Sequence, residues 1–321
     1  MSADFTMPNW QERCVQLIDR LASGGDGQKA YRDADAEMIR RTTRGQGPDS
    51  ATAKPEAGVR VVYNIPAVHV PALVAAGSTS KNNRPFKNRY DLDKTGRQTV
   101  RLGEDPPAPA RIDVRKSVDE AVAVLARVSD GSNLYYGAAE LNGAGMRYYG
   151  DICLVLKPAE IDEETLVLYR NSFDLARPPI ANRIKSTPPN TRLQRTIDEA
   201  REFEGRWQAD LASMAACKAL DGGRWGERRI TTAAISDGLL NDEDYLEVVR
   251  TRSFGCEQLE EVRVAAADAG AEGRIADRIK QGPSPTQTEL LWRHHRRYAD
   301  QALKEKGVRT RIVVTAGRAR V

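Results

Sequence analysis

Apolar residues in the middle of the chain fall into two short blocks, which predict two buried strands. Ile152–Leu156 is an uninterrupted apolar run, and Leu166–Tyr169 is nearly as long and just as apolar. The stretch between them, residues 159–165, carries four carboxylates, a composition typical of a solvated loop. We therefore predict that the two blocks form one β-hairpin, with the rest of the chain packed around it.

The same alternation of apolar and polar positions predicts further elements on both sides of this hairpin. Short apolar or β-branched runs indicate strands at Val59–Ile65, near Ile230, at Tyr245–Thr251, Val262–Val264 and Arg309–Thr315. Apolar residues spaced by three and four indicate helices at Trp10–Ala22, residues 30–41, 72–76, from Ser117 to about residue 129, Arg192–Leu220 and Thr286–Lys306. Ser117 and Glu120 have the spacing of a capping box, and Gly222 and Gly223 end the long helix.

These elements predict an α+β fold in which helices pack on a mainly antiparallel sheet. Residues 1–58 form a helical and flexible N-terminal segment, in which residues 42–57 are rich in glycine, proline and polar side chains. Residues 59–321 form a single α+β domain with a candidate active-site cleft. Residues 78–89 and 91–111 are polar or proline-rich and predict loops or extended chain.

Composition limits the classes of protein to which the chain can belong. Its 321 residues contain 49 Lys and Arg against 45 Asp and Glu, so the net charge is only +4 and non-specific nucleic-acid binding is not required. No apolar stretch is long enough to span a membrane, and no secretory signal is visible, so we expect a cytoplasmic protein. The cysteines are Cys14, Cys153, Cys217 and Cys256; they lack CxxC spacing and predict buried free thiols.

Most of the common catalytic signatures are missing from the sequence. There is no Walker loop, no GxGxxG after a strand, no HExxH and no GxSxG. His294 and His295 are adjacent, so they point in different directions and do not form the i, i+4 pair of a helical metal site. The sequence therefore predicts chemistry without a metal.

Three polar residues occur in an order that suits glycosyl transfer. Arg60 lies on an early strand, Ser172 follows a middle strand, and Glu247 opens a late strand. A cation for a diphosphate and an anion for a developing sugar cation are what a dissociative glycosyl transfer needs, because electrostatic placement supplies most of the catalysis. This order resembles that of the mono-ADP-ribosyltransferase toxins and effectors of the arginine, serine, glutamate class.

The resemblance implies a function, a cofactor and partners. Glu247 would stabilise the oxocarbenium ion, Ser172 would support it, and Arg60 would hold the phosphates of NAD, which is the substrate. The NAD-binding residues would be Arg60, Tyr63, Tyr149, Asn171 and Ser172. The target would be a protein or a nucleic acid, and an immunity or chaperone protein would be a further partner; the protein would act in the cytoplasm, including that of another cell into which it is delivered.

Several alternatives stay open at this level. Thr231-Thr232 competes with Ser172 as the serine motif, and Tyr245 replaces the Glu or Gln that the family has two positions before its glutamate, which weakens the case for arginine as the modified residue. A second interpretation is a metal-free ribonuclease or nucleic-acid-binding effector. It would use the residues Arg84, Lys87, Arg89, His69 and Tyr63. A third interpretation is a non-catalytic interaction protein.

Overall fold

The computed structural model describes residues 10–12, 14–16, 29, 58–75, 86, 88, 109–221 and 245–314. In these residues helices pack around one eight-stranded sheet, which confirms the predicted α+β class. The predictions for residues 17–28, 30–57, 78–85, 91–108 and 222–244, among them the strand near Ile230, lie outside the described residues.

The sheet runs through the centre of the molecule and is antiparallel except at one edge. Its strand order is β5-β4-β6-β2-β1-β3-β7-β8, and only the β7–β8 pair is parallel. The strands are β1 (Arg60–Ile65), β2 (Tyr135–Glu140), β3 (Ile152–Leu156), β4 (Leu166–Leu168), β5 (Glu204–Arg206), β6 (Glu247–Arg250), β7 (Leu259–Ala265) and β8 (Thr310–Val313).

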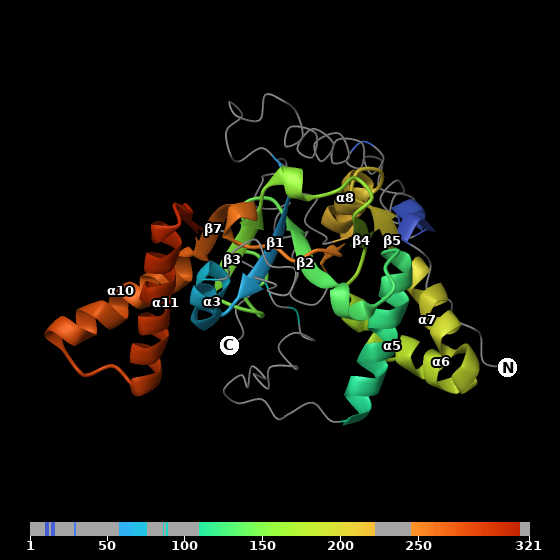
Figure 1. Cartoon of the computed structure of the whole chain (residues 1–321), viewed down its shortest axis with the longest axis horizontal. Coiled ribbons are helices and arrows are strands. Elements are labelled where there is room, and N and C mark those ends of the chain that lie inside the picture. Colours follow the sequence, from blue (N-terminus) through green and yellow to red (C-terminus); the bar gives the residue numbers. More distant parts are fainter. Residues whose placement is uncertain are drawn as a thin grey trace.

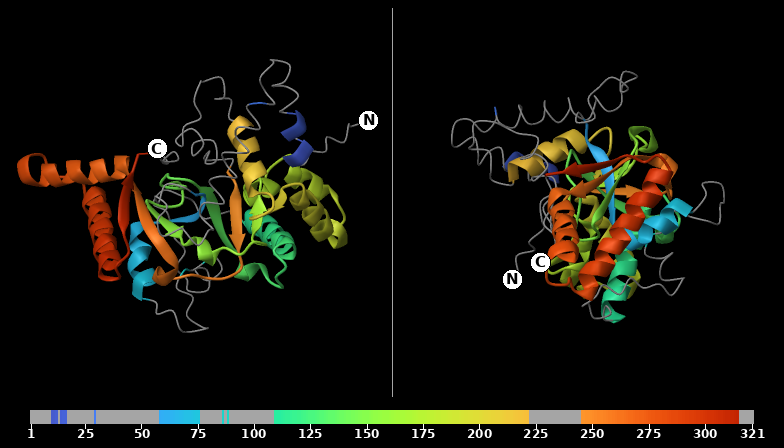
Figure 2. Two further views of the ribbon diagram at one scale, coloured as in Figure 1. Left: turned by 90° about the horizontal axis from the view of Figure 1, so that it is seen from above. Right: turned by 90° about the vertical axis from the view of Figure 1, so that its left-hand side faces the viewer.

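Helices gather at the two ends of this sheet (Figure 1). One end carries α10 (Ala266–Gln281) and α11 (Gln287–Glu305), which lie beside β7, β8 and α3 (Val70–Ala75). The other end carries α5 (Pro109–Leu125), α6 (Ile180–Ser186), α7 (Arg192–Arg201) and α8 (Leu211–Asp221). The left view of Figure 2 shows this division from above, with the sheet between the two groups.

The predicted central hairpin is wrong, although both of its strands exist. β3 pairs with β1 and β7, β4 pairs with β5 and β6, and three strands separate β3 from β4. A crossing of four strand spacings is about 19 Å, and residues 157–165 can span about 30 Å when extended. A strand that is apolar on both faces belongs in the middle of a sheet, where it has two neighbours rather than one hairpin partner.

The long helix predicted over Arg192–Leu220 is also wrong, because the chain breaks it into α7, the edge strand β5 and α8. β5 pairs with β4 and extends the sheet by one strand. A Cβ atom at Gly205 would lie 2.3 Å from the Cε atom of Met214 in α8, so α8 packs closely on β5 and a larger residue here would displace the Met214 side chain. Periodicity alone could not show this interruption, since the residues around it keep a helical spacing.

Two other helical predictions need correction. The helix predicted to begin at Ser117 begins at Pro109, which leaves Ser117 inside α5 and without a capping role. Proline is well suited to the first turn of a helix, because no intrahelical partner is needed for its nitrogen there. The helix α10 was not predicted at all, since its alanine- and glycine-rich sequence has a weak apolar stripe. Helix α11 agrees with the helix predicted over Thr286–Lys306, and Thr286 caps its first turn.

The cysteine prediction is wrong for one pair. Cys14 and Cys217 form a disulfide with a Cα–Cα distance of 5.6 Å, which joins the N-terminal helical residues to α8. Trp10, in the same N-terminal stretch, donates its indole hydrogen to the carbonyl oxygen of Glu204 and stacks with Tyr169. Cys153 and Cys256 are free thiols. A spacing of 203 residues carries no sequence signal for such a pair.

Candidate functional site

The structure brings Ser172 and Glu247 into direct contact. Glu247 is the first residue of β6, as predicted, and Ser172 begins the short 3₁₀ helix Ser172–Ala176 that follows β4. Because β4 pairs with β6, the end of β4 is carried next to the start of β6. The backbone N–H of Ser172 donates to Oε2 of Glu247 at 2.7 Å, and both residues are almost fully buried.

Tyr245 supports the other oxygen of the same carboxylate. Its hydroxyl donates to Oε1 of Glu247 at 3.3 Å. Tyr245 lies two positions before Glu247, the first residue of β6, and its hydroxyl reaches the Glu247 side chain on the same face of the sheet. Two donors from separate segments therefore hold the Glu247 carboxylate in position. Glu247 is only 2% exposed. Asn171 lies beside this contact, where its side chain accepts from the N–H of Phe173 and caps the 3₁₀ helix.

Arg60 lies on the same face of the sheet as Glu247. Glu247 is opposite Ala138, Ala138 is opposite Val62, and Arg60 is two residues before Val62 on β1. Residues opposite each other on neighbouring strands share a face, and so do residues two apart on one strand. From the strand spacing and rise, the backbones of Arg60 and Glu247 are about 12 Å apart. In this conformation the Arg60 side chain is bound to Glu260 on β7, on the side of β1 away from β6.

The same face carries further charged residues that sequence reasoning missed. Glu140 is opposite Arg60, and Glu261, Arg263 and Arg311 follow on β7 and β8. Of these residues, Glu140, Glu261 and Arg263 are buried. A sequence signal was present in β7, where Glu261 and Arg263 alternate with valines.

Two neighbouring titratable groups on this face, Glu261 and Cys153, have pKa values that are shifted in opposite directions. Burial would raise the pKa of Glu261, but hydrogen bonds and charges from Arg263 and Arg311 outweigh it and hold this pKa below its ordinary value. Burial also raises the pKa of the Cys153 thiol to about 12, despite the opposing charge of Arg263. The face therefore keeps Glu261 ionised and Cys153 protonated at neutral pH.

Tyr63 lies apart from this group, on the opposite face of β1. It is buried against Phe86 and Phe254, and its hydroxyl donates to the carbonyl oxygen of Tyr135 at 3.2 Å. Burial raises its pKa well above the ordinary tyrosine value. Tyr63 therefore belongs to the apolar core and does not share a ligand with Arg60.

Tyr149 is also separated from Arg60 and Glu247. It lies in the turn before β3, is 39% exposed, and packs edge-on against Tyr148. The neighbouring Gly150 accepts a hydrogen bond from Asn64, near the other end of β1 from Arg60. Along a strand this is a separation of about 13 Å.

The structure describes only some of the residues on which the alternative interpretations depend. Arg84, Lys87, Arg89 and Thr231-Thr232 lie outside the described residues. His69 ends the 3₁₀ helix Ala67–His69, which packs against α11. His294 and His295 lie on α11, and no group of three potential metal ligands occurs among the residues that the structure places.

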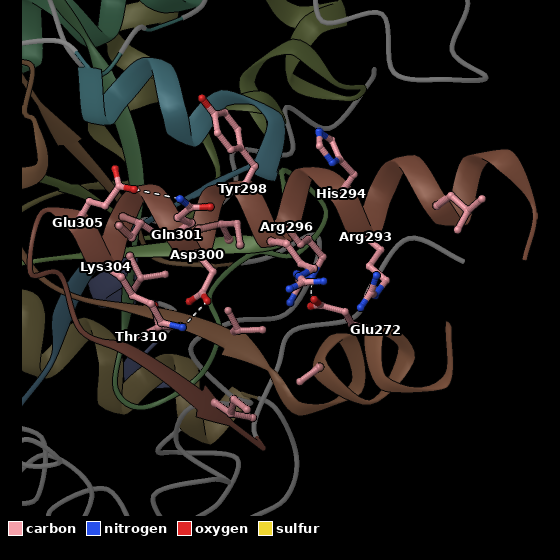
Figure 3. A pocket seen from close by; sticks show the side chains of 18 residues that line it. Glu272, Arg293, His294, Arg296, Tyr298, Asp300, Gln301, Lys304, Glu305 and Thr310 are labelled. Atoms are coloured by element: carbon pink, nitrogen blue, oxygen red, sulfur yellow. Dashed lines mark hydrogen bonds and ion pairs between the residues drawn. The ribbon is translucent and has the colours of Figure 1, made fainter. Parts of the chain in front are cut away.

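A separate groove of about 750 Å³ lies between α11, α10 and strands β7 and β8. Figure 3 shows Arg293, Arg296 and Glu272 toward one end of α11 and Lys304 and Thr310 toward the other. Arg296 is held by Glu272 and Asp151, and Lys304 by Asp300. Two of these partners, Glu272 and Asp300, also line the groove, whereas Asp151 does not, and the groove contains none of Arg60, Ser172 and Glu247.

Comparison with protein-family models, with curated proteins and with solved structures found no match for this chain. In the described ranges, no helix combines the length and the apolar character that a membrane span requires. Arguments about function therefore rest on the arrangement of Arg60, Ser172 and Glu247.

Proposed function

We propose that this protein cleaves the bond between nicotinamide and ribose in NAD and transfers ADP-ribose to a protein or nucleic-acid target, as a toxin or effector. The observation that carries the proposal is the 2.7 Å hydrogen bond from the Ser172 N–H to the Glu247 carboxylate, on the face of the sheet that also carries Arg60. Ser172 and Glu247 are distant in sequence and meet because β4 pairs with β6.

In this reaction the glycosidic C–N bond breaks and nicotinamide leaves with its electron pair. The ribose carbon becomes an oxocarbenium ion, which the negative charge of Glu247 stabilises. A nucleophile of the target, or water, then forms the new bond to that carbon and loses a proton. Because Ser172 and Tyr245 fix the carboxylate in advance, little reorganisation is needed as the positive charge develops.

Arg60 would bind the diphosphate of NAD. A guanidinium group offers two parallel N–H donors, which match two oxygens of a phosphate. Two strand spacings separate Arg60 from Glu247, which suits a dinucleotide whose diphosphate and nicotinamide ribose must be held at the same time. Asn171 and Ser172 lie at the ribose end of this arrangement, whereas Tyr63 and Tyr149 take no part.

The test is to incubate the purified protein with NAD labelled in its adenylate part and with a cell extract. Release of nicotinamide together with transfer of label to macromolecules would support the proposal, and nuclease or protease digestion would identify the class of target. Release of nicotinamide without transfer would indicate water as the nucleophile. If neither release nor transfer occurred at millimolar NAD, the proposal would be wrong and the interaction-protein hypothesis would take its place.

A further inference from the structure

Strand β7 contains an irregularity that places an extra carboxylate beside Arg60. Val155 of β3 is opposite Glu261, but the next residue, Leu156, is opposite Leu259, so the register shifts at Glu260. Two residues of β7 then face one residue of β3, which is the geometry of a β-bulge. A bulge redirects a side chain, and here Glu260 reaches past β3 to β1.

Glu260 binds Arg60 through two of the three nitrogens of the guanidinium group. Nε of Arg60 donates to Oε2 at 2.5 Å, and Nη2 donates to Oε1 at 3.2 Å. The Arg60 side chain is 9% exposed and that of Glu260 is 29% exposed. Glu260 is thus the more accessible partner of the pair.

This ion pair occupies the Nε and Nη2 edge of the guanidinium group, which is one of the edges through which arginine binds a phosphate. A carboxylate and a phosphate both accept two parallel N–H bonds from one guanidinium group, and they cannot occupy the same two donors together. The third nitrogen of the guanidinium group, Nη1, donates to the carbonyl oxygen of Val59 at 3.4 Å. All three nitrogens of the guanidinium group therefore have partners in this conformation.

We propose that Glu260 competes with phosphate for Arg60. It occupies the guanidinium group of Arg60 until a diphosphate displaces it. The inference rests on the proposed function and adds a regulatory residue to it. Displacement frees the Glu260 carboxylate toward solvent, where water rehydrates it, and the exchange keeps the charge of Arg60 compensated throughout. Glu260 is a positioning residue, since it acts through Arg60 and not on the reacting atoms.

The experiment measures ADP binding by calorimetry at low ionic strength, for the wild type and for Glu260→Gln. The amide keeps one acceptor for Arg60 but removes the negative charge, so we expect ADP to bind about tenfold more tightly to the variant. The double variant Arg60→Ala with Glu260→Gln should lose this gain. Glu257→Gln is the matched control, because Glu257 precedes β7 in the 3₁₀ helix Cys256–Gln258, whereas the Arg60 side chain is bound by Glu260 and the carbonyl oxygen of Val59.

Three outcomes separate this inference from the proposed function. If Glu260→Gln binds ADP no better than the wild type, or if the gain persists without Arg60, the competition is disproved. If ADP binding responds as expected but NAD is never cleaved, the phosphate site stands and the transferase assignment falls. If NAD is cleaved, Glu260→Gln should lower KM for NAD about tenfold with kcat nearly unchanged, whereas equal changes in both constants would contradict competition at Arg60. Thermal melting of each variant checks that folding is retained.

Discussion

Replacement of Glu247 by glutamine removes a negative charge from the face of the sheet while it preserves most of the local structure. The amide oxygen can still accept from the N–H of Ser172, which is 2.7 Å from the carboxylate oxygen. The amide nitrogen can donate to the hydroxyl of Tyr245, because a hydroxyl group rotates to accept as well as to donate. The charge is therefore the main property that changes.

The expected effects on stability and on rate differ in size. One altered hydrogen bond changes the free energy of unfolding by about 1–2 kcal/mol. Loss of one preorganised electrostatic contact in a transition state costs about 100- to 1000-fold in rate, which is about 3–4 kcal/mol of activation free energy. The proposed mechanism therefore predicts a folded variant that releases nicotinamide at about 1% of the wild-type rate or less.

The assay is nicotinamide release at saturating NAD, normalised to the folded fraction from urea denaturation. Glu272→Gln serves as the control, since Glu272 is a glutamate on α10 that is ion-paired with Arg296, at the end of the sheet opposite the one that carries α5–α8. Its rate per folded molecule should stay within about twofold of the wild type, because no charge near the developing oxocarbenium ion changes. A Glu247→Gln rate within about threefold of the wild type would show that this carboxylate does not stabilise the transition state.

Three further predictions concern stability and thiol chemistry. Leu154→Asp places a carboxylate at a fully buried position of β3; this costs several kcal/mol, comparable with the whole stability of a domain, so a soluble variant with an unchanged Tm would contradict the strand assignment. Arg263 lowers the folded-state pKa of Glu261, so the ionised carboxylate stabilises the fold above its unfolded pKa of about 4.3, and this stabilisation is lost as pH falls through the folded value. Urea denaturation at pH 7 and at pH 3 should therefore show a smaller loss of unfolding free energy for Glu261→Gln than for the wild type. Protein denatured without reductant should titrate two thiols and, after reduction, four, whereas four thiols in both samples would exclude the Cys14–Cys217 bond.

Local sequence patterns determined most of the strands and the fold class. Runs such as Ile152–Leu156 and Leu259–Ala265 are apolar or alternating, and such runs form strands because their side chains must be buried on one or both faces. The order of Arg60, Ser172 and Glu247 along the chain was also visible, together with the position of Glu247 at the start of a strand. These properties depend on residues that are adjacent in the sequence, so the sequence alone is enough to predict them.

Only the tertiary structure decided which strands pair and which side chains meet. Residues 152–156 and 166–168 are close in sequence but have different partners, since strand pairing is settled by long-range packing of apolar faces. The contact of Ser172 with Glu247 depends on that pairing, and the contact of Arg60 with Glu260 depends on a single extra residue in β7. A one-residue shift of register changes the face to which a side chain points, and no local pattern in the sequence reports such a shift.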